Sequence, residues 1–576
     1  MTVKSGTQPV LPVEPSGFCG SLGTQTAKPH FKSVLKGMPE SMKLSVPRFY
    51  DTTLRDGNQA IGVNFSVDDK IKIARRLSDF GIDYIEGGWP NITSPAEIEF
   101  FRRIKNEQIS SAIAVFGITR KPDLKPEDDR NLRTLLSAGA DYITLMGKAW
   151  TLHVEKVLGT SLRRNLQMVS DSTGYLYGNG CNVIFDAEHF YDGYKENPSY
   201  AINIVASAEE AGAREIVLCD TRGGTTPTEI YEITREVKRE ISKPVGIHAH
   251  NDRGLATVNS LFALMAGAEH VQGTINGLGE RCGNANLIEV IGNLAITYGV
   301  NTGVDISKLS ELSSYVYEIS NVRRNNYQPF VGRFAFAHKG GIHGHAVLKC
   351  PEAYESFDPT LVGNTRSIAV SSQTGLANIV EKAKEFGFNL KKGSFAATRI
   401  LREVKEKEAQ GYHYENAGAS LNLLYARALG VDLKYFDLLN WRAFVLGDGR
   451  RVSAESTVKL KMGSQALIAA AEGNGPVNAF DIALKRALKT QHPELSKVRL
   501  VGYRVREINV EKGTAAAVQV FAEFKANTKR WSTIGVSPNI LKASEEALID
   551  GYLYYLHKIR GSEGSAENPS VSVRKS

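Results

Sequence analysis

Residues 245–252, Val245-Gly-Ile-His248-Ala-His250-Asn-Asp252, join a short apolar run to two histidines two positions apart. On a β-strand, side chains two positions apart point to the same face. Comparable apolar runs recur through residues 47–300. Longer stretches with helical periodicity, such as Val67–Phe80 and Ala201–Ala211, separate these runs. The chain therefore alternates strand and helix over this whole region.

Eight such apolar runs occur in the region. Eight strand–helix units in about 250 residues are typical of a closed (β/α)8 TIM barrel, an α/β fold. A doubly wound open sheet is the alternative, but the even repetition of the units favours closure. The expected strands are Arg48–Asp51, Tyr84–Gly88, Ile113–Gly117, Tyr142–Met146, Asn182–Asp186, Ile216–Asp220, Val245–His250 and His270–Ile275.

The composition is that of an ordinary soluble globular protein. The 576 residues are 42% hydrophobic and 23% charged, which excludes collagen, coiled coil and wholesale disorder. The net charge of +8 comes without a dense Lys/Arg stripe, so nucleic acid is not an expected partner. No apolar run is long enough to span a membrane. Five widely spaced cysteines without a Cys-x-x-Cys pair favour a reducing compartment, and we expect a cytoplasmic protein.

Composition also divides the chain into segments. Residues 1–46 are rich in Ser, Thr, Gly and Pro, and we expect a disordered N-terminal extension. An organelle transit peptide is the alternative, although the segment contains no Arg. We expect the TIM-barrel catalytic domain over 47–300, small helical linker subdomains over 301–430, an α+β regulatory domain over 431–560 and a disordered tail over 561–576.

The region after the barrel changes character twice. Between 301 and 430 we expect helices at Asp305–Asn321, Ala377–Phe386 and Leu421–Leu429, with a Gly/His-rich linker from His338 to His345. After 431, a strand followed by a proline and a helix occurs twice, which predicts a duplicated ββα unit. Pro476 and Pro538 are expected in the first helical turns, where proline is tolerated. Such a domain senses a small molecule or serves dimerisation. The expected elements are Ser456–Lys461 with Val477–Leu488, and Ala515–Phe524 with Asn539–Leu556.

Ionisable side chains gather at the ends of the expected strands, where the active site of a TIM barrel lies. Two imidazoles at His248 and His250, with a carboxylate from Asp56 and the amide of Asn284, make a sensible site for a divalent metal. The histidine pair alone is more often structural. Its place at a strand end, with the other two residues at further strand ends, favours the metal.

Other strand-end residues have two interpretations each. Arg55 is either half of an ion pair at the barrel mouth or a cation that stabilises charge on a substrate oxygen. Glu188 is a general base or an ordinary rim carboxylate. Thr221 offers a hydroxyl to a substrate carboxylate, although a threonine after an aspartate is also common in turns.

Three motifs resemble one enzyme family. DTTLRDGNQ at 51–59, HAHND at 248–252 and NGLGERCGN at 276–284 are similar to the metal-dependent acyl-CoA condensing enzymes, the 2-isopropylmalate, homocitrate and citramalate synthases. The likeness covers about 47–560. Three further motifs resemble the citramalate synthase branch, namely YIEGGWP at 84–90, FDAEHFYDGYKENP at 185–198 and LCDTRGG at 218–224.

The resemblance implies roles for individual residues. The metal ligands would be Asp56, His248, His250 and Asn284, and the metal Mg, Mn or Zn. Arg55 would be the charge-stabilising arginine, Glu188 the catalytic glutamate and Thr221 the ligand of the keto-acid carboxylate. His343 would be the catalytic histidine that reaches the partner subunit of a homodimer, with His338 as a second candidate. The tyrosine that some members place after this histidine motif has no counterpart in the stretch that ends at Arg366-Ser.

The resemblance also implies a reaction. Acetyl-CoA would condense with pyruvate and water to give citramalate and CoA, on a route through 2-oxobutanoate to isoleucine, and isoleucine would be the effector of the C-terminal domain. Trp89 would restrict the keto-acid pocket to pyruvate. A 2-isopropylmalate synthase that uses 2-oxoisovalerate is the nearest alternative. A lyase that works in the cleavage direction and a catalytically silent barrel are the others.

Overall fold

The computed structural model describes residues 44–560, with the exception of 45, 92, 448, 451 and 509. The disorder expected for 1–46 and 561–576 thus concerns segments outside the described residues, apart from Leu44 and Val46. The chain forms two compact units, one up to Arg323 and one from Arg324 onward. Among the described residues, no helix has the length and apolar character that crossing a membrane requires.

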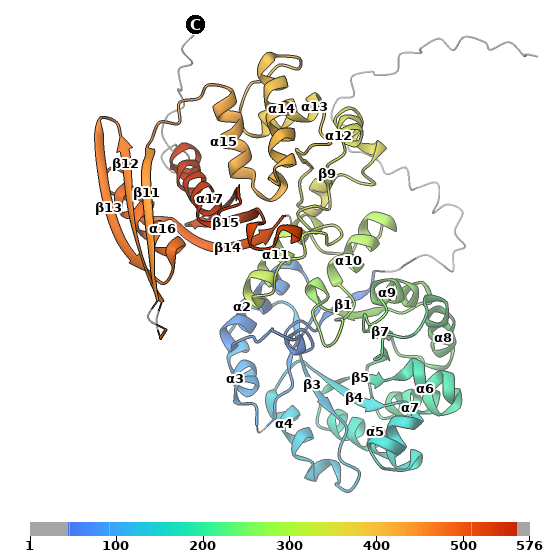
Figure 1. Cartoon of the computed structure of the whole chain (residues 1–576). Coiled ribbons are helices and arrows are strands. Elements are labelled where there is room, and N and C mark those ends of the chain that lie inside the picture. The colour runs from blue at the N-terminus through green and yellow to red at the C-terminus, as the bar shows by residue number, and fades with distance from the viewer. Residues whose placement is uncertain are drawn as a thin grey trace, which may run out of the picture. The chain divides into compact units, whose positions relative to one another are not determined.

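The first unit is built on a closed barrel of eight parallel strands that pair in chain order (Figure 1). Strands β1 and β8 pair with each other in register, Arg48 opposite His270 and Asp51 opposite Gly273, and so close the sheet. The predicted TIM barrel is confirmed, and the open-sheet alternative is wrong. The strands are β1 Arg48–Asp51, β2 Tyr84–Gly88, β3 Ala112–Ile118, β4 Tyr142–Lys148, β5 Asn182–Glu188, β6 Glu215–Asp220, β7 Val245–Ala249 and β8 His270–Gly273.

Helices between the strands begin and end where local chemistry requires. Helix α2 starts after Ser66, whose hydroxyl accepts from the Asp69 N–H in a capping box, and ends at Gly81 in the left-handed conformation. These ends match the predicted Val67–Phe80. The helices of this unit are α2 Val67–Phe80, α3 Pro95–Ile104, α4 Arg130–Ala138, α5 Leu162–Gly178, α6 Phe190–Glu196, α7 Pro198–Glu210, α8 Pro227–Glu240, α9 Ala256–Met265, α10 Leu287–Gly292 and α11 Leu309–Ser320.

The second unit begins with a helical region. Two short strands, β9 Ala337–His338 and β10 Ser367–Ile368, form a parallel sheet. Strand β9 comes before the first helix of this unit, and β10 comes after it. The predicted Gly/His-rich linker from His338 to His345 is wrong from residue 341 on, because α12 begins there. Gly344 lets this helix pack closely, because a Cβ there would lie 2.5 Å from Asn378 Nδ2. The helices are α12 Gly341–Lys349, α13 Leu376–Glu385, α14 Phe395–Ala409 and α15 Gly418–Ala428.

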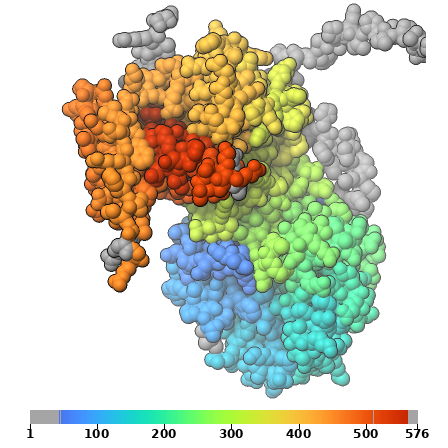
Figure 2. Space-filling view, viewed as in Figure 1, coloured from blue at the N-terminus to red at the C-terminus, as the bar shows by residue number. Residues whose placement is uncertain are grey.

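The C-terminal part contains two copies of one motif, as predicted, but each copy has three antiparallel strands instead of two. The outer strands β11 and β14 are mostly solvent-exposed, so they lack the buried alternation that identifies a strand in a sequence. The β11–β13 sheet, orange in Figure 2, shows this exposed face. The copies are β11 Asp437–Gly447, β12 Val452–Met462, β13 Gln465–Gly473 and α16 Pro476–Leu488, then β14 Arg499–Glu507, β15 Val518–Ala526, β16 Lys529–Ser537 and α17 Ile540–Tyr554.

The two copies differ at the start of their helices. Pro476 is the first helical residue of α16, as expected. The same expectation for Pro538 is wrong, because α17 begins only at Ile540. Asn539 is its N-cap residue, and the Asn539 side chain accepts hydrogen bonds from the N–H groups of Leu541 and Lys542.

Both copies contribute to one hydrophobic core, which contains Leu460, Phe480, Phe524 and Tyr552. Phe524 stacks on Trp531 with ring centroids 5.7 Å apart and meets the edge of Tyr552 at 5.6 Å. A Cβ at Gly551 of α17 would lie only 2.1 Å from Phe524 Cε2. Helix α17 therefore packs so closely on the sheet that only glycine fits at this position.

We predict that Gly551→Ala lowers the free energy of unfolding by about 1–3 kcal/mol, the usual cost of overpacking a rigid core. The measurement is thermal unfolding followed by calorimetry. The control is Gly418→Ala at the start of α15, where a Cβ meets nothing within 4 Å, so no destabilisation is expected. Equal melting temperatures for the two variants would contradict the close packing of α17 on Phe524.

Candidate active site at the rim of the barrel

Three predicted metal ligands meet at the C-terminal rim of the barrel. Asp56 follows β1, His248 lies in β7 and His250 comes directly after β7. The distance from Asp56 Oδ2 to His248 Nε2 is 3.3 Å, and His248 Nε2 lies 3.4 Å from His250 Nε2. The three residues are buried, and their ligand atoms lie within 4.8 Å of one another. The structure thus places the two histidines side by side, as their spacing predicts.

Asn284 joins this group from the segment after β8. The Asn284 Nδ2 group donates to Asp56 Oδ2 at 2.7 Å and lies 3.2 Å from His248 Nε2. An isolated β-bridge between His250 and Asn284 holds the two chain segments together. A half-turn of the amide would exchange its two end atoms and bring Oδ1 to the same position. All four predicted ligands therefore lie around one point.

The charges in this group suit metal binding. Burial would raise the pKa of the Asp56 carboxyl, but the Arg55 charge and the His248 hydrogen bond hold it well below its usual range. Burial, and then the charge of His248, lower the pKa of His250 to about 3. Burial would lower the pKa of His248, but the hydrogen bond to Asp56 raises it, so metal binding at His248 competes with a proton. A charged carboxylate and a neutral imidazole are the protonation states that bind a cation.

In the part of the chain that the structure describes, two buried polar atoms of this group lack a hydrogen-bond partner, which tests whether its donors fit a metal. Among the described residues, His250 Nδ1 and Asn284 Oδ1 have no hydrogen-bond partner. Unpartnered buried polar atoms are rare in folded proteins, and a bound ion is one way to satisfy them. With the carboxylate of Asp56 and two imidazoles, the donors fit a divalent cation.

Arg55 adds a fixed positive charge beside the group. Its Nε donates to Glu86 Oε2 at 2.6 Å, its Nη1 lies 3.3 Å from Asp56 Oδ1, and its guanidinium covers the Phe116 ring at 4.1 Å. Burial would lower the pKa of Arg55, but Asp56 and Glu86 raise it above its usual value. Tyr50 in turn donates to Glu86 Oε1 at 2.9 Å. The ion-pair interpretation of Arg55 is confirmed, and its role in stabilising charge on a substrate oxygen stays a prediction.

Gln272 and Asp186 orient His248, and sequence reasoning missed both roles. His248 Nδ1 lies 2.7 Å from Gln272 Oε1, and Gln272 Nε2 donates to Asp186 Oδ1 at 3.1 Å. An amide oxygen only accepts, so His248 carries a proton on Nδ1, and its Nε2 faces Asp56. Gln272 lies opposite His248 in the register of β7 and β8, a pairing that the sequence alone does not give.

Glu188 and Thr221 lie at the ends of neighbouring strands. Glu188 is the last residue of β5 and forms an ion pair with Lys148, its register partner in β4. Thr221 follows β6, and its hydroxyl oxygen accepts from the backbone N–H of His189 at 2.9 Å. Sequence reasoning did not single out Lys148. Glu188 and Thr221 lie outside the cluster of Asp56, His248 and His250, so their roles stay predictions.

The two candidate histidines of the second unit have different surroundings. His343 lies on α12 and is exposed, with its ring 4.6 Å from that of Tyr354. His338 Nε2 lies 3.0 Å from Glu355 Oε1, and Arg366 Nε donates to the same oxygen at 2.7 Å. His338 is thus held in a charge cluster, whereas His343 faces solvent. Tyr354 was not singled out by the sequence.

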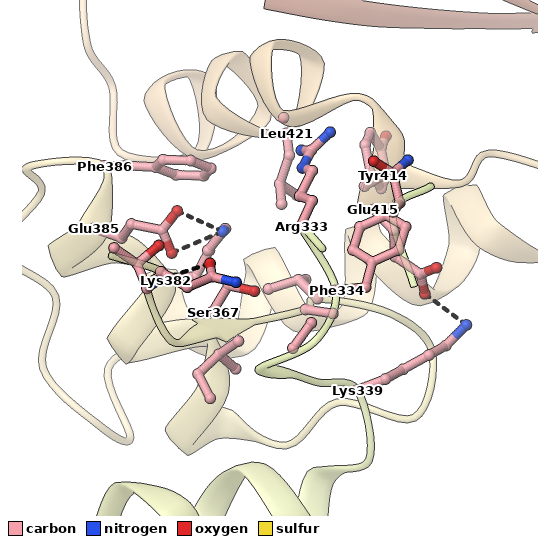
Figure 3. Close-up of a pocket in the computed structure, with 18 of the residues that line it drawn as sticks. Arg333, Phe334, Lys339, Ser367, Lys382, Glu385, Phe386, Tyr414, Glu415 and Leu421 are labelled. Atoms are coloured by element: carbon pink, nitrogen blue, oxygen red, sulfur yellow. Dashed lines mark hydrogen bonds and ion pairs between the residues drawn. The ribbon is translucent and has the colours of Figure 1, made fainter. Parts of the chain in front are cut away.

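A cavity of about 710 Å³ lies within the second unit (Figure 3). Two ion pairs line its wall, Lys382 with Glu385 at 2.7 Å and Lys339 with Glu415 at 2.5 Å. None of the predicted site residues lines this cavity. It is therefore separate from the candidate active site.

Comparison with known proteins gives the family. Residues 46–316 match the HMGL-like family, 330–411 the homocitrate synthase post-HMGL domain-like family and 416–556 the LeuA allosteric (dimerisation) domain. The chain is 46% identical to the (R)-citramalate synthase of Geobacter sulfurreducens, over 91% of this chain and 100% of that protein. It is also 46% identical to the (R)-citramalate synthase of Aquifex aeolicus, over 88% of this chain and 97% of that protein. The chain belongs to the (R)-citramalate synthase family.

The leucine-pathway alternative has weaker support. The 2-isopropylmalate synthase of Methanocaldococcus jannaschii is 33% identical, over 87% of this chain and 93% of that protein. The predicted resemblance to the condensing synthases, and to their citramalate synthase branch, is confirmed. The C-terminal match supports a dimerisation and regulatory domain in this citramalate synthase family member.

We predict that Gln272→Leu weakens divalent metal binding by about 10–100-fold, because loss of the partner on Nδ1 frees the His248 ring to turn and to change its tautomer. Calorimetric titration of Mn²⁺ into metal-free protein measures the change. Gln167→Leu, an exposed position on α5, is the control and leaves the affinity unchanged. Unaltered affinity in Gln272→Leu would show that this side chain does not orient a metal ligand.

Proposed function

We propose that this chain is an (R)-citramalate synthase that condenses acetyl-CoA with pyruvate and water to give citramalate and CoA. The identity of 46% over the full length of the Geobacter (R)-citramalate synthase carries the proposal. The convergence of Asp56, His248, His250 and Asn284 at the barrel rim supports it. This acyl transfer would be the first step of a route from pyruvate through 2-oxobutanoate to isoleucine.

The buried rim group would hold a divalent cation, Mg, Mn or Zn, through Asp56, His248, His250 and Asn284. Such an ion supplies a Lewis acid that polarises the keto group of pyruvate. Arg55, fixed by Glu86 at 2.6 Å, would stabilise the negative charge that develops on the attacked oxygen. Because Arg55 is already held in place, it needs no reorganisation during the reaction.

Thr221 would bind the carboxylate of pyruvate. Its hydroxyl oxygen already accepts from the His189 N–H, so the hydroxyl hydrogen is free to donate to a substrate oxygen. The threonine is thus oriented as a donor. This arrangement would fix pyruvate with its keto carbon toward the second substrate.

Glu188 and His343 are the two candidates for the base that removes a methyl proton from acetyl-CoA. Lys148 positions the Glu188 carboxylate in an ion pair. His343 is exposed on α12 and would reach the barrel of the partner in a homodimer. One of the two residues would remove the proton, and the other would orient that base.

The remaining parts of the chain would serve regulation. We place catalysis in the barrel over 47–300, a helical linker over 301–430 and a regulatory domain over 431–560 that dimerises and binds isoleucine. The match of 416–556 to an allosteric (dimerisation) domain supports this division. The four cysteines that the structure describes are free, which agrees with a cytoplasmic location.

The first test is release of CoA, followed with a free-thiol reagent. With acetyl-CoA and Mn²⁺, we expect strong release with pyruvate, little with 2-oxoisovalerate and none after EDTA treatment. A preference for 2-oxoisovalerate would make the protein a 2-isopropylmalate synthase instead. Release without metal would contradict the role of the Asp56 group.

The second test concerns substrate size. Trp89 meets Phe116 edge-on at 5.5 Å, and Phe116 in turn lies under Arg55, so the indole is two contacts from the proposed charge-stabilising group. We predict that Trp89→Ala shifts the ratio of kcat/KM toward 2-oxoisovalerate by about 10–200-fold, the range for a change in pocket volume. The kcat/KM for pyruvate in the same variant is the internal control. An unchanged ratio of the two kcat/KM values would show that Trp89 does not line the keto-acid pocket.

A further inference from the structure

A second group of potential metal ligands lies at the same end of the barrel. His153 begins a short helical turn after β4, Glu188 ends β5 and His189 follows it. One ligand atom from each lies within 4.8 Å of the others. None of these residues belongs to the Asp56 group, and the reaction proposed above uses only Glu188.

The two imidazoles of this group have free nitrogens. Among the described residues, His153 Nδ1 and His189 Nδ1 are buried without a hydrogen-bond partner. The His189 side chain is only 8% exposed, and its nearest carboxylate oxygen, Asp192 Oδ2, is 3.7 Å from Nδ1, beyond hydrogen-bond distance. The ring centroids lie 4.0 Å apart at 46°, closer than aromatic pairs usually pack. Two rings this close together, each with an unpartnered nitrogen, suit a shared cation.

Burial and the nearby charges favour the neutral form of His153. Burial, and then the charges of His189 and Lys148, lower the pKa of His153. Two cations face the group, Lys148 on Glu188 and Arg222 over the Trp150 ring at 5.3 Å, and the carboxylates of Glu188 and Asp192 oppose them. Neutral imidazole is the form that binds a metal. Trp150 stacks on His153 at 5.6 Å and limits the motion of its ring.

We infer that His153, Glu188 and His189 form a second cation site, selective for a borderline transition metal such as Zn²⁺. Two imidazoles and one carboxylate with an open position are a usual Zn²⁺ donor set, whereas Mg²⁺ prefers oxygen ligands and retains its waters. Lys148 Nζ pairs with the Glu188 carboxylate. An incoming cation would take the place of the Lys148 ammonium at that carboxylate. His153 and Glu188 are only partly buried, which leaves a path of entry from solvent.

Occupation of this site would inhibit the enzyme, a consequence that rests on the proposed function. A Glu188 carboxylate bound to Zn²⁺ can neither remove a proton nor orient the group that does. The binding itself does not depend on that function. Metal counting and kinetics therefore test the site and its consequence separately.

The experiment loads metal-free full-length protein with Zn²⁺ and counts bound zinc by mass spectrometry after buffer exchange. We expect a second equivalent per chain in the wild type and its loss in His153→Gln. The control His413→Gln, an exposed histidine in the second unit, keeps both equivalents. A single equivalent in the wild type overturns the inference.

A second variant, which should bind the second zinc ion more tightly, shows that the loss of zinc in His153→Gln is not caused by misfolding. Lys148→Met removes the competing cation from Glu188, so we expect the second equivalent to bind about tenfold more tightly or better, because an uncompensated carboxylate near a cation attracts it more strongly. Impaired folding cannot produce tighter binding. Unchanged or weaker binding of the second equivalent in Lys148→Met contradicts the competition between Lys148 and the metal.

Kinetics then test the consequence. With saturating Mn²⁺, added Zn²⁺ should inhibit wild-type CoA release, and His153→Gln should retain the Mn²⁺-supported rate while it resists zinc at least tenfold better. Two bound equivalents without inhibition would leave the site intact and refute the role of Glu188 in the proposed reaction. Equal inhibition of both proteins would overturn the inferred site as the place where zinc acts.

Discussion

The buried charge of Asp56 is the interaction on which the rim of this barrel depends. Its side chain is almost fully enclosed, and an isolated carboxylate there would cost several kcal/mol. Three groups from different parts of the chain offset that cost, namely Arg55 beside it, His248 on β7 and Asn284 after β8. These groups converge only because β1 and β8 pair and close the sheet. Closure of the barrel and the charge of its candidate metal site therefore support each other.

A layer of polar side chains beneath the rim makes this arrangement rigid. Glu86 holds Arg55, and Tyr50 holds Glu86, so the guanidinium has a fixed direction. Gln272 and Asp186 fix the ring of His248 in the same way. Burial raises the pKa of Asp186 to about 6 and that of Asp51 to about 7, so the interior of this end tolerates few further charges. Arg55 pairs with both Asp56 and Glu86, so one guanidinium links the candidate metal site to the layer beneath it.

The sequence predicted the residues that converge at the rim better than those that position them. Asp56, His248, His250 and Asn284 follow strand ends, and strand ends of a parallel barrel meet at one rim, so their convergence follows from order along the chain. Gln272, Glu86 and Lys148 act through contacts across strands whose register no local pattern reveals. A linker was predicted where α12 forms, because only the closeness of Asn378 explains the glycine at 344. Strands β11 and β14 were missed because their faces are exposed.

The Asp56 group and the Glu188 group each offer two imidazoles and a carboxylate, but the cation beside the carboxylate differs. Around Asp56, Arg55 lies 3.3 Å from Oδ1, while His248 and Asn284 contact Oδ2, so the Arg55 ion pair and the other candidate ligands use different oxygens. Around Glu188, Lys148 contacts the carboxylate itself, and a metal must displace it. An arginine cannot lose its proton, whereas a displaced lysine has solvent nearby. Under the two proposals, a metal at the first group would leave the Arg55 ion pair in place, whereas a metal at the second would displace Lys148 from Glu188.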